Sequence, residues 1–535
     1  MKQISNYFFN TTLYKAVCIC AFMLVPSLVF CFFPQVVSII LLLWGALLLL
    51  RDMKYRNFAK QTGSVFLLLF CLGYVVTLVL YAENDLVSTI HIFCWAIIEF
   101  FLLFAVDRDR DTSPNALLGE MFCINAAVSM VGLLSGLASL TFFFMKISVV
   151  MPDPEGLNAF WSMGIVNGRN SGIFNNAIPC ANAMFVGCAA ALFNLLHDKE
   201  KSVVQSILYT VTIVVCYLVI LTTLTRTYIY GVYIFVFVAT FAAGYQRIKG
   251  DTALVIKKIV TVLVIAVLSV VLLIGGTEVS KKIMEKAVAN VPVNSIVLNV
   301  EGFNKNTTDG TTEIEATEVT TEATTKATLS EEELMDQISD KLGLGAEITM
   351  ERNELGRLPS FLYPRDELWA VALEVIPYSP VFGFTSGNRN SSSTQYSTSE
   401  YLVKNWSNGI PTYHNAYFDI AVSAGLLGLG LLLVFLGIQI FRTLRTIFTK
   451  ELDVRNKRGK LAFGVLVSYL AIHVFVTSMF FGVLCFSNVS VCLYFWIAMG
   501  YVSRINDQCD DGTSKLSTNA IVENMLKLKG TKNER

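Results

Sequence analysis

The chain has 535 residues, of which 54% are hydrophobic and only 15% are charged, well below the roughly 25% of a soluble globular protein. Its 41 basic and 41 acidic side chains balance, so net charge gives no support to nucleic acid as a partner, and we expect none. Apolar runs near the ~20 residues that cross a bilayer recur along the chain. This pattern predicts an all-α fold, that of a polytopic helical membrane protein.

About twelve apolar runs are expected to be transmembrane helices. The first, Ala16 to Phe33, resembles a signal peptide but has no small-residue cleavage site, so we interpret it as retained. In chain order the expected spans are 15–33, 35–50, 64–82, 86–106, 117–145, 177–196, 203–224, 227–246, 254–275, 415–441, 461–482 and 486–503.

The basic residues predict that both termini are cytoplasmic. Of the 41 lysines and arginines, 11 lie in one long loop between Gly275 and His414, where the charge rule does not apply. Three more, Lys146, Arg169 and Arg226, lie in short outer loops, and the remaining 27 lie inside. We therefore expect a multi-pass membrane protein with both ends on the inner side.

The chain is expected to divide into five parts. These are helices 1–5 (residues 1–150), helices 6–9 with outer arginine motifs (151–275), a large extracytoplasmic loop (276–413), helices 10–12 (414–503) and a cytoplasmic tail (504–535). Within the loop, the Thr/Glu-rich segment 306–333 has too little apolar surface to fold, so it is expected to be disordered.

The rest of the long loop is expected to contain a short helix. Leu368, Val371, Ala372 and Val375 have helical spacing, and the two prolines that follow end the helix. The run "SSSTQYSTS" is expected to be a polar loop. The twelve cysteines lie mostly in apolar runs and are interpreted as small hydrophobic residues, which gives no disulfide framework and no metal site.

Polar residues stand out at four places on the outer side. They are Arg169 in "NGRNSGIFNNAIP", Arg226 in "TTLTRTYIYG", Arg365 with Trp369, and His414 with Asn415. The planar guanidinium of arginine suits a phosphate, because it donates two parallel charge-assisted hydrogen bonds. Histidine accepts a proton near neutral pH, and an adjacent amide orients it or a substrate hydroxyl. Together these residues suit transfer of a group away from a pyrophosphate.

Each of these residues also has a structural interpretation. Arg226 alone is more typical of an interfacial anchor, Arg365 stands beside two acidic residues as in a surface ion pair, and His414 alone suits a bond to a backbone carbonyl. The spacing Gly425-x-x-Gly428 is typical of close helix packing, which is the interpretation we favour for these glycines.

The same residues resemble the signature of a known family. His414-Asn415, nine residues, Gly425, two residues and Gly428 resemble the H-[NSQ]-x9-G-x-x-G pattern of bacterial O-antigen ligases and related O-antigen polymerases. "GRNSGIFNN", "LTTLTRTYIYG" and Arg365-x3-Trp369 followed by "PYSPVFGFTSG" are similar to further motifs of that family, in the same order. The resemblance covers about residues 160–440.

The resemblance implies a GT-C-like membrane glycosyltransferase without metal or other cofactor. Its donor would be a lipid-linked oligosaccharide on undecaprenyl diphosphate at the outer leaflet, and its acceptor a glycan or another hydroxyl. His414 would be the catalytic base with Asn415 beside it, and Arg169, Arg226 and Arg365 would bind the diphosphate. The chain departs from the family in having Ser423 where an acidic residue is common, with Asp419 nearby.

Several functions remain open at this point. A polymerase adds the glycan to a second lipid-linked glycan, whereas a ligase adds it to another acceptor; we favour the polymerase, since nothing in the sequence indicates an outer membrane. A flippase for the same lipid also has use for arginines. A twelve-span transporter fits less well, because transporters place polar groups near the middle of the bilayer, and Glu99 is one of few such groups here.

Overall fold

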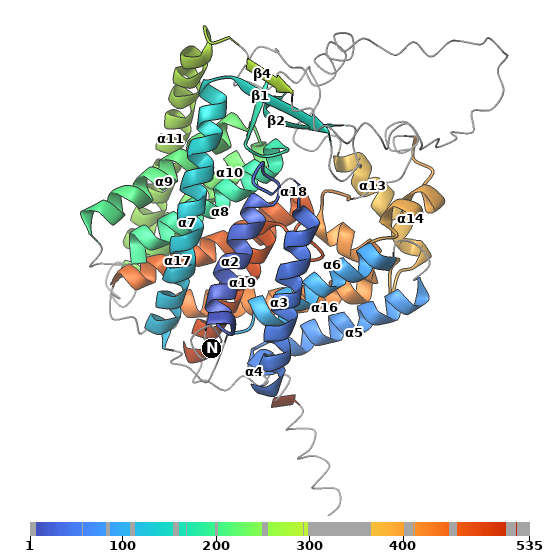
Figure 1. The fold of residues 1–535 in the computed structure, drawn as a ribbon. Coiled ribbons are helices and arrows are strands. Elements are labelled where there is room, and N and C mark those ends of the chain that lie inside the picture. Colours follow the sequence, from blue (N-terminus) through green and yellow to red (C-terminus); the bar gives the residue numbers. More distant parts are fainter. Residues whose placement is uncertain are drawn as a thin grey trace, which may run out of the picture.

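The structure is a computed structural model, and it describes most of the helical part of the chain (Figure 1). The described residues are 7–30, 32–55, 57–81, 86–106, 113–152, 160–166, 168–197, 202–248, 255–292, 294–297, 365–400, 410, 412–448, 457–509 and 520–521. The Thr/Glu-rich segment 306–333, expected to be disordered, lies outside them.

A helix occupies each of the twelve segments that the sequence predicts to span a membrane, which confirms the polytopic helical fold. These helices are α2 (Thr11–Leu24), α3 (Pro34–Tyr55), α5 (Ser64–Leu80), α6 (Leu86–Ile98) with the π-helix η1 (Glu99–Leu103), α7 (Pro114–Phe144), α8 (Ala177–His197), α9 (Val203–Thr222), α10 (Arg226–Ile248), α11 (Val255–Val288), α16 (Ala416–Phe448), α17 (Lys457–Ile472) with the π-helix η4 (His473–Thr477) and α18 (Ser478–Phe481), and α19 (Ser490–Cys509). A short helix, α4 (Asn57–Lys60), precedes α5.

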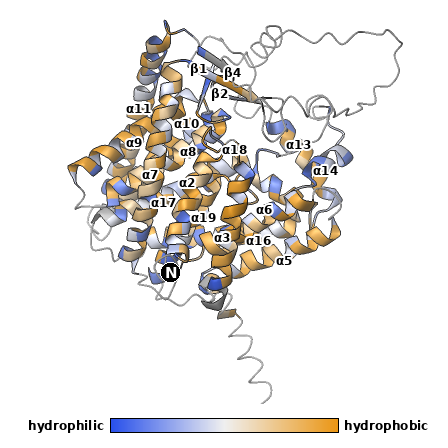
Figure 2. Cartoon of the chain, viewed as in Figure 1, coloured by the Kyte–Doolittle hydropathy of each residue, from blue (hydrophilic) through white to orange (hydrophobic). Residues whose placement is uncertain are grey.

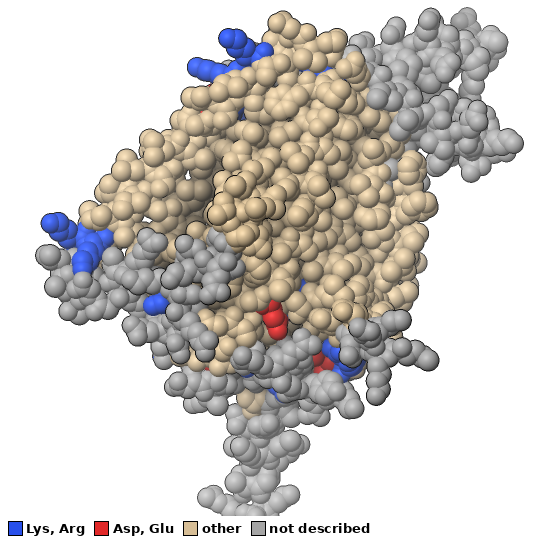
Figure 3. Space-filling view, turned by 60° about the vertical axis from the view of Figure 1, so that its left-hand side comes forward, with Lys and Arg blue, Asp and Glu red and all other residues tan. Residues whose placement is uncertain are grey.

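Nine helical segments in the described residues are long and apolar enough to cross a membrane, and α2, α5 and α19 fall outside that criterion. The helices are predominantly apolar along their lengths (Figure 2). In Figure 3 lysine and arginine gather at the top and at the lower left, aspartate and glutamate are visible only near the lower edge, and a broad uncharged band lies between the top and the lower part. Because charged side chains are costly in hydrocarbon, this distribution is that of a protein embedded in a bilayer.

The helix α19 lies at the centre of the molecule. Its residues from Ser490 to Asp507 are all buried. Trp496 on this helix packs against Phe100 and Phe435, and its indole N–H donates a hydrogen bond to the carbonyl of Leu484 at 2.9 Å. Buried polar groups in a membrane protein need such internal partners, since no water reaches them.

A four-stranded sheet that the sequence did not predict lies at the end of the molecule opposite the N-terminus (Figure 1). Its strands are β1 (Ile147–Pro152), β2 (Phe160–Val166), β3 (Arg169–Gly172) and β4 (Asn294–Val297), in the order β3-β2-β1-β4. β1 pairs antiparallel with β2 and parallel with β4, and β2 pairs antiparallel with β3. The sheet is relevant to function because β3 begins with Arg169.

The long loop contains the expected short helix. α13 (Arg365–Val375) buries the four residues with helical spacing and is followed by the 3-10 turn η3 (Ile376–Tyr378), which confirms the prediction. The expectation of a polar loop for "SSSTQYSTS" is wrong in its first part, because α14 (Arg389–Tyr396) covers it. The hydroxyls of Ser391, Ser392 and Ser393 donate to carbonyls three residues earlier, which satisfies these polar groups within the helix.

Candidate functional site

His414 lies in a turn immediately before α16, with a left-handed backbone (φ 51°). Such a conformation is uncommon for residues other than glycine, so its surroundings must hold it. Asn415 begins the helix: its side-chain oxygen accepts hydrogen bonds from the backbone N–H groups of Tyr417 (3.0 Å) and Phe418 (3.3 Å). Asn415 therefore has the structural role of a helix cap, and it fixes the point from which His414 projects.

The carboxylate of Asp419 secures the turn from the first helical turn of α16. One oxygen accepts from the backbone N–H of Tyr413 (2.9 Å) and lies 3.0 Å from the guanidinium of Arg389. The other accepts from the hydroxyl of Thr412 (2.8 Å). Arg389 begins α14 and also donates its Nε–H to the carbonyl of Ser386 (3.1 Å). The two residues that precede His414 are thus tied to one ion pair.

The imidazole of His414 is half-buried and makes no hydrogen bond within the described residues. Burial lowers the pKa of His414 below its usual value, and the positive charge of Arg365 lowers it further, while the carboxylate of Asp419 raises it. The net effect is a pKa below 6.5. The side chain is consequently neutral at neutral pH and able to accept a proton.

Arg365 lies beside this histidine at the start of α13. Its guanidinium carbon stands over the ring of Phe480, 5.5 Å from the ring centre. Trp369, one turn later, packs against the rings of Phe418 and Phe480 with centre-to-centre distances of 6.0 and 6.4 Å. These aromatic contacts anchor α13 to the start of α16 and to α18, and they hold the Arg365 charge near His414.

Gly425 interrupts α16 ten residues after the Asn415 cap. Its φ of 70° and ψ of 179° lie in a region that only glycine adopts readily. Four backbone hydrogen bonds join segment 379–386 to α16 at this break: Leu426 N to Pro380 O (2.7 Å), Leu427 N to Val381 O (3.3 Å), Phe384 N to Val422 O (2.8 Å) and Thr385 N to Ser423 O (2.9 Å). Our interpretation of Gly425 as ordinary helix packing is therefore wrong, because this glycine provides a docking point for the loop. Gly428 does pack closely, against Ala424 and Phe70.

The helix α5 holds the same loop from the other side. Thr77 donates its hydroxyl hydrogen to the carbonyl of Phe382 (2.6 Å), and Tyr81, just after the helix, donates to the hydroxyl of Ser379 (3.1 Å). Tyr74 donates to the hydroxyl of Ser386 (3.0 Å) and accepts from its backbone N–H (2.9 Å). The helix α5 and the residue after it thus support the site directly, although the family motifs lie outside this part of the chain.

Arg169 and Arg226 form a second group. Arg169 donates its Nε–H to the carbonyl of Thr223 (3.0 Å) and its NH2 group to the hydroxyl of Thr225 (3.2 Å). The neighbouring Asn170 donates to the hydroxyl of Thr222 (3.0 Å). Arg226 follows directly as the first residue of α10. Two motifs that are more than fifty residues apart in the sequence therefore meet at this turn.

The short helix α18 lies between the two groups of arginines. The ring of Phe481 stacks on Tyr228 of α10, at 5.0 Å between ring centres, and the adjacent Phe480 lies under Arg365. Gly482, which ends α18, faces Asp419: a Cβ there would lie 2.4 Å from a carboxylate oxygen. The structure therefore brings His414, Asn415 and Arg365 together, and places Arg169 with Arg226 on the far side of α18.

Comparison with known families identifies one segment of the chain. Residues 211–433 match the family model described as O-antigen ligase. This segment of the chain is an O-antigen ligase domain. The match contains the turn with Arg226, both short outer helices, the His414 turn and the Gly425 break, whereas Arg169 precedes it. A search of curated proteins gives no match. The matched domain and the apolar helices together indicate a multi-pass membrane protein of the ligase or polymerase type of glycosyl transfer.

The sequence does not predict two residues of the candidate site. Arg389 is hidden in a polar run of serines, and nothing in its neighbourhood indicates a buried partner. The sequence indicates Asp419 only as an acidic residue near position 423, where an acidic residue is common in the family. The signal for it was its place four residues after the Asn415 cap, which directs its side chain back over the preceding turn.

Proposed function

We propose that this protein is a surface polysaccharide polymerase. It transfers glycan from an undecaprenyl-diphosphate donor to a hydroxyl of a second lipid-linked glycan, at the outer face of the bacterial plasma membrane. The observation that carries the proposal is the unbonded, neutral imidazole of His414 beside the guanidinium of Arg365. This pair offers a proton acceptor and a positive charge at one place.

In the proposed reaction, the acceptor hydroxyl oxygen attacks the anomeric carbon of the donor sugar. The bond between that carbon and the diphosphate oxygen breaks, and its electron pair leaves with the lipid diphosphate. The hydroxyl proton passes to a ring nitrogen of His414, whose lowered pKa keeps it deprotonated at the start. The diphosphate gains negative charge as it leaves, and the fixed charge of Arg365 stabilises it. No metal is required for these steps.

The arginines divide the work of binding the donor in this proposal. Arg365 is nearest His414 and contacts the phosphate that leaves. Arg169 and Arg226, across α18, receive the lipid-side phosphate. Arg169 is already oriented by Thr223 and Thr225, so little conformational entropy is lost when a phosphate binds beside it. Asn415 contributes as the cap that positions His414, and contact with substrate is not needed for that role.

The proposal is tested by glycan extension in membranes supplied with a lipid-linked donor, beside a donor-binding assay. His414→Ala should reduce the extension rate by roughly 10²–10⁴ while donor binding is largely kept. Arg365→Ala should weaken both binding and rate, because the diphosphate is charged in the ground state as well as the transition state. His197→Ala is the matched control and should extend glycan normally, because His197 ends α8 and the segment with Arg169 precedes the start of that helix.

The results also separate the alternatives. Near-normal extension by His414→Ala removes the histidine as the base. A flippase needs no base. Normal lipid transport by the His414→Ala protein, together with defective transport by the arginine variants, would therefore favour that function. Products that remain on lipid diphosphate and grow in length support a polymerase, whereas a single transfer to an acceptor without lipid diphosphate supports a ligase.

A further inference from the structure

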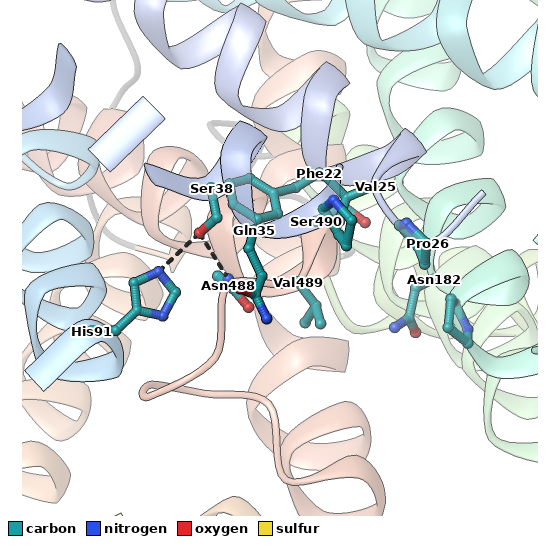
Figure 4. Close-up of a pocket in the computed structure, with 12 residues that line it drawn as sticks. Phe22, Val25, Pro26, Gln35, Ser38, His91, Asn182, Asn488, Val489 and Ser490 are labelled. Carbon is teal, nitrogen blue, oxygen red and sulfur yellow. Dashed lines mark hydrogen bonds between the residues drawn. The ribbon is translucent and has the colours of Figure 1, made fainter. Parts of the chain in front are cut away.

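A cavity of about 260 Å³ has no role in the mechanism above (Figure 4). It is enclosed by the end of α2 and start of α3, by α6, by the start of α8 and by the segment leading into α19. Its lining residues are Phe22, Val25, Pro26, Pro34, Gln35, Ser38, His91, Pro179, Asn182, Asn488, Val489 and Ser490.

Two walls of the cavity continue into the candidate site. On one side, the backbone N–H of Asn175 donates to the carbonyl of Pro26 (2.9 Å), which joins the lining to the segment that begins with Arg169. On the other side, the chain runs from Gly482, which faces Asp419, to Asn488 at the cavity. The cavity lining is therefore linked through the backbone to the segment that begins with Arg169 and to the segment that faces the His414 turn.

The cavity lies at a shallow depth below the helix ends. Ser38 is four residues into α3, while His91 and Asn182 are each five residues into α6 and α8. At a rise of 1.5 Å per residue these side chains lie about 6–8 Å below the ends of their helices. This is the end of the molecule that carries His414, so the cavity and the site share one side of the membrane.

The lining is largely apolar in area, and the polar groups that it carries are uncharged. Half of the twelve lining residues have an amide, hydroxyl or imidazole group, and none of the twelve is Asp, Glu, Lys or Arg. Ser38 bonds the ring of His91 (3.0 Å) and accepts from the indole N–H of Trp95 (3.0 Å), which fixes one side of the cavity. Asn182, only 6% exposed, has a side-chain oxygen without a partner, and its amide lies at the other side of the cavity (Figure 4).

These features select the chemistry of a ligand. A phosphate needs a cation, and the lining has none. An alkyl chain would leave the buried carbonyl of Asn182 unpaired, at a cost in free energy. A sugar ring suits the lining, because each of its hydroxyls both donates and accepts, as amides do, and its carbon face packs on apolar walls such as Phe22. The volume of this cavity lies below the ~300–1,000 Å³ of pockets that bind drug-sized ligands. A cavity of this size suits a single sugar ring.

We propose that this cavity binds one uncharged sugar residue of the glycan substrate and holds the glycan in register with His414. The inference rests on the proposed function and extends it by assigning a sugar subsite. Asn182 supplies the acceptor oxygen, and Asn488 and Gln35 supply further amide groups at the rim.

The first test compares the kinetics of two cavity variants of the full-length protein in lipid nanodiscs. Asn182→Leu removes the amide at similar size, and Val489→Trp fills the space. Each should raise KM for the lipid-linked glycan by about fivefold or more with kcat largely kept, as expected for a lost hydrogen bond in binding. Asn194→Leu, a buried asparagine on the same helix at the opposite end, is the control and should leave KM unchanged.

The second test reads occupancy without activity. A photoreactive diazirine analogue of leucine at Val489, close to valine in size so that the cavity stays open, is irradiated with lipid-linked glycan tritiated in its sugars, and separately with phosphatidylglycerol tritiated in its headgroup. We expect cross-linking to the glycan, reduced by Asn182→Leu. Cross-linking to phosphatidylglycerol alone would make the cavity a phospholipid site, and no cross-linking to either probe would leave it without a sugar; both results overturn the inference.

The outcomes distinguish this inference from the proposed function. If His414→Ala loses extension while Asn182→Leu and Val489→Trp match Asn194→Leu, the sugar subsite is wrong and the proposed function stands. If glycan cross-links at the cavity but His414→Ala extends normally, the subsite stands and the role of His414 is wrong.

Discussion

Gly383 and Gly425 approach each other so closely that a Cβ on Gly383 would lie 2.5 Å from the backbone nitrogen of Gly425. Both have a positive φ, of 71° and 70°. The loop from the outer helix and the break in α16 thus meet backbone to backbone, with no side chain between them. This contact places the segment after α13 against the helix that begins beside His414, and links two motifs that are forty residues apart.

The glycine contact gives the first prediction. In Gly425→Ala the new Cβ would lie 2.0 Å from the carbonyl of Val381, and the backbone conformation alone costs about 1–3 kcal/mol for a non-glycine residue. We expect the thermal midpoint of the detergent-solubilised protein to fall and glycan extension to be lost. Gly430→Ala, five residues later, meets no atom within 4 Å and is the control. Equal midpoints for the two variants would show that the break tolerates a side chain.

The sequence predicted the helices well and the break poorly, for physical reasons that these residues illustrate. Apolar spacing identifies α13, because Leu368, Val371, Ala372 and Val375 share one face whatever lies opposite. A glycine pair spaced by three is compatible with both tight packing and a break, and only the docked loop decides between them. The sequence motif therefore marked the position of Gly425 without indicating its conformation.

The site was predicted in a similar way. Residues with distinctive chemistry, His414 and the arginines of the outer segments, were found from their types. Arg389 was not, since its significance comes from an ion pair with Asp419 that forms only when α14 packs beside α16. The unpredicted sheet has the same origin: β4 joins β1 through a pairing of residues almost 150 positions apart.

The second prediction concerns the ion pair beside the histidine. Asp419→Asn keeps the size of the side chain but leaves the guanidinium of Arg389 without its counter-charge. Loss of one partner of a buried pair costs about 3–5 kcal/mol, and we expect the lower end, because the Arg389 side chain remains 16% exposed. Thermal unfolding measures this loss. The double variant Asp419→Asn/Arg389→Gln should regain part of the stability, while extension stays low because the His414 turn has lost its anchor. Additive losses in the double variant would contradict the coupling.

The third prediction is a shift in the pH profile. The reaction needs deprotonated His414, so kcat/KM should fall as the pH drops through the pKa of that residue. The charge of Arg365 lowers this pKa, and its removal in Arg365→Gln should raise the pKa and move the acid limb of the profile to higher pH. Arg365→Lys keeps the charge, so its limb should stay near that of the unmodified protein, although KM for the donor rises because the bidentate fork is lost. Asp366→Asn, at an exposed neighbour, is the control. An unmoved limb in Arg365→Gln would mean that another group titrates.

The last prediction concerns the side of the membrane on which the site lies. Of the 41 lysines and arginines, 27 fall in the segments assigned to the cytoplasm, and the tract around Thr320 belongs to the loop that precedes His414. A cysteine in Thr320→Cys should react with an impermeant maleimide in intact cells, whereas one in Arg455→Cys should react only after lysis. The unsubstituted protein is the control for its own cysteines, most of which are buried where the structure describes them. Labelling of Thr320→Cys only after lysis would place His414 in the cytoplasm, where a donor at the outer leaflet cannot reach it.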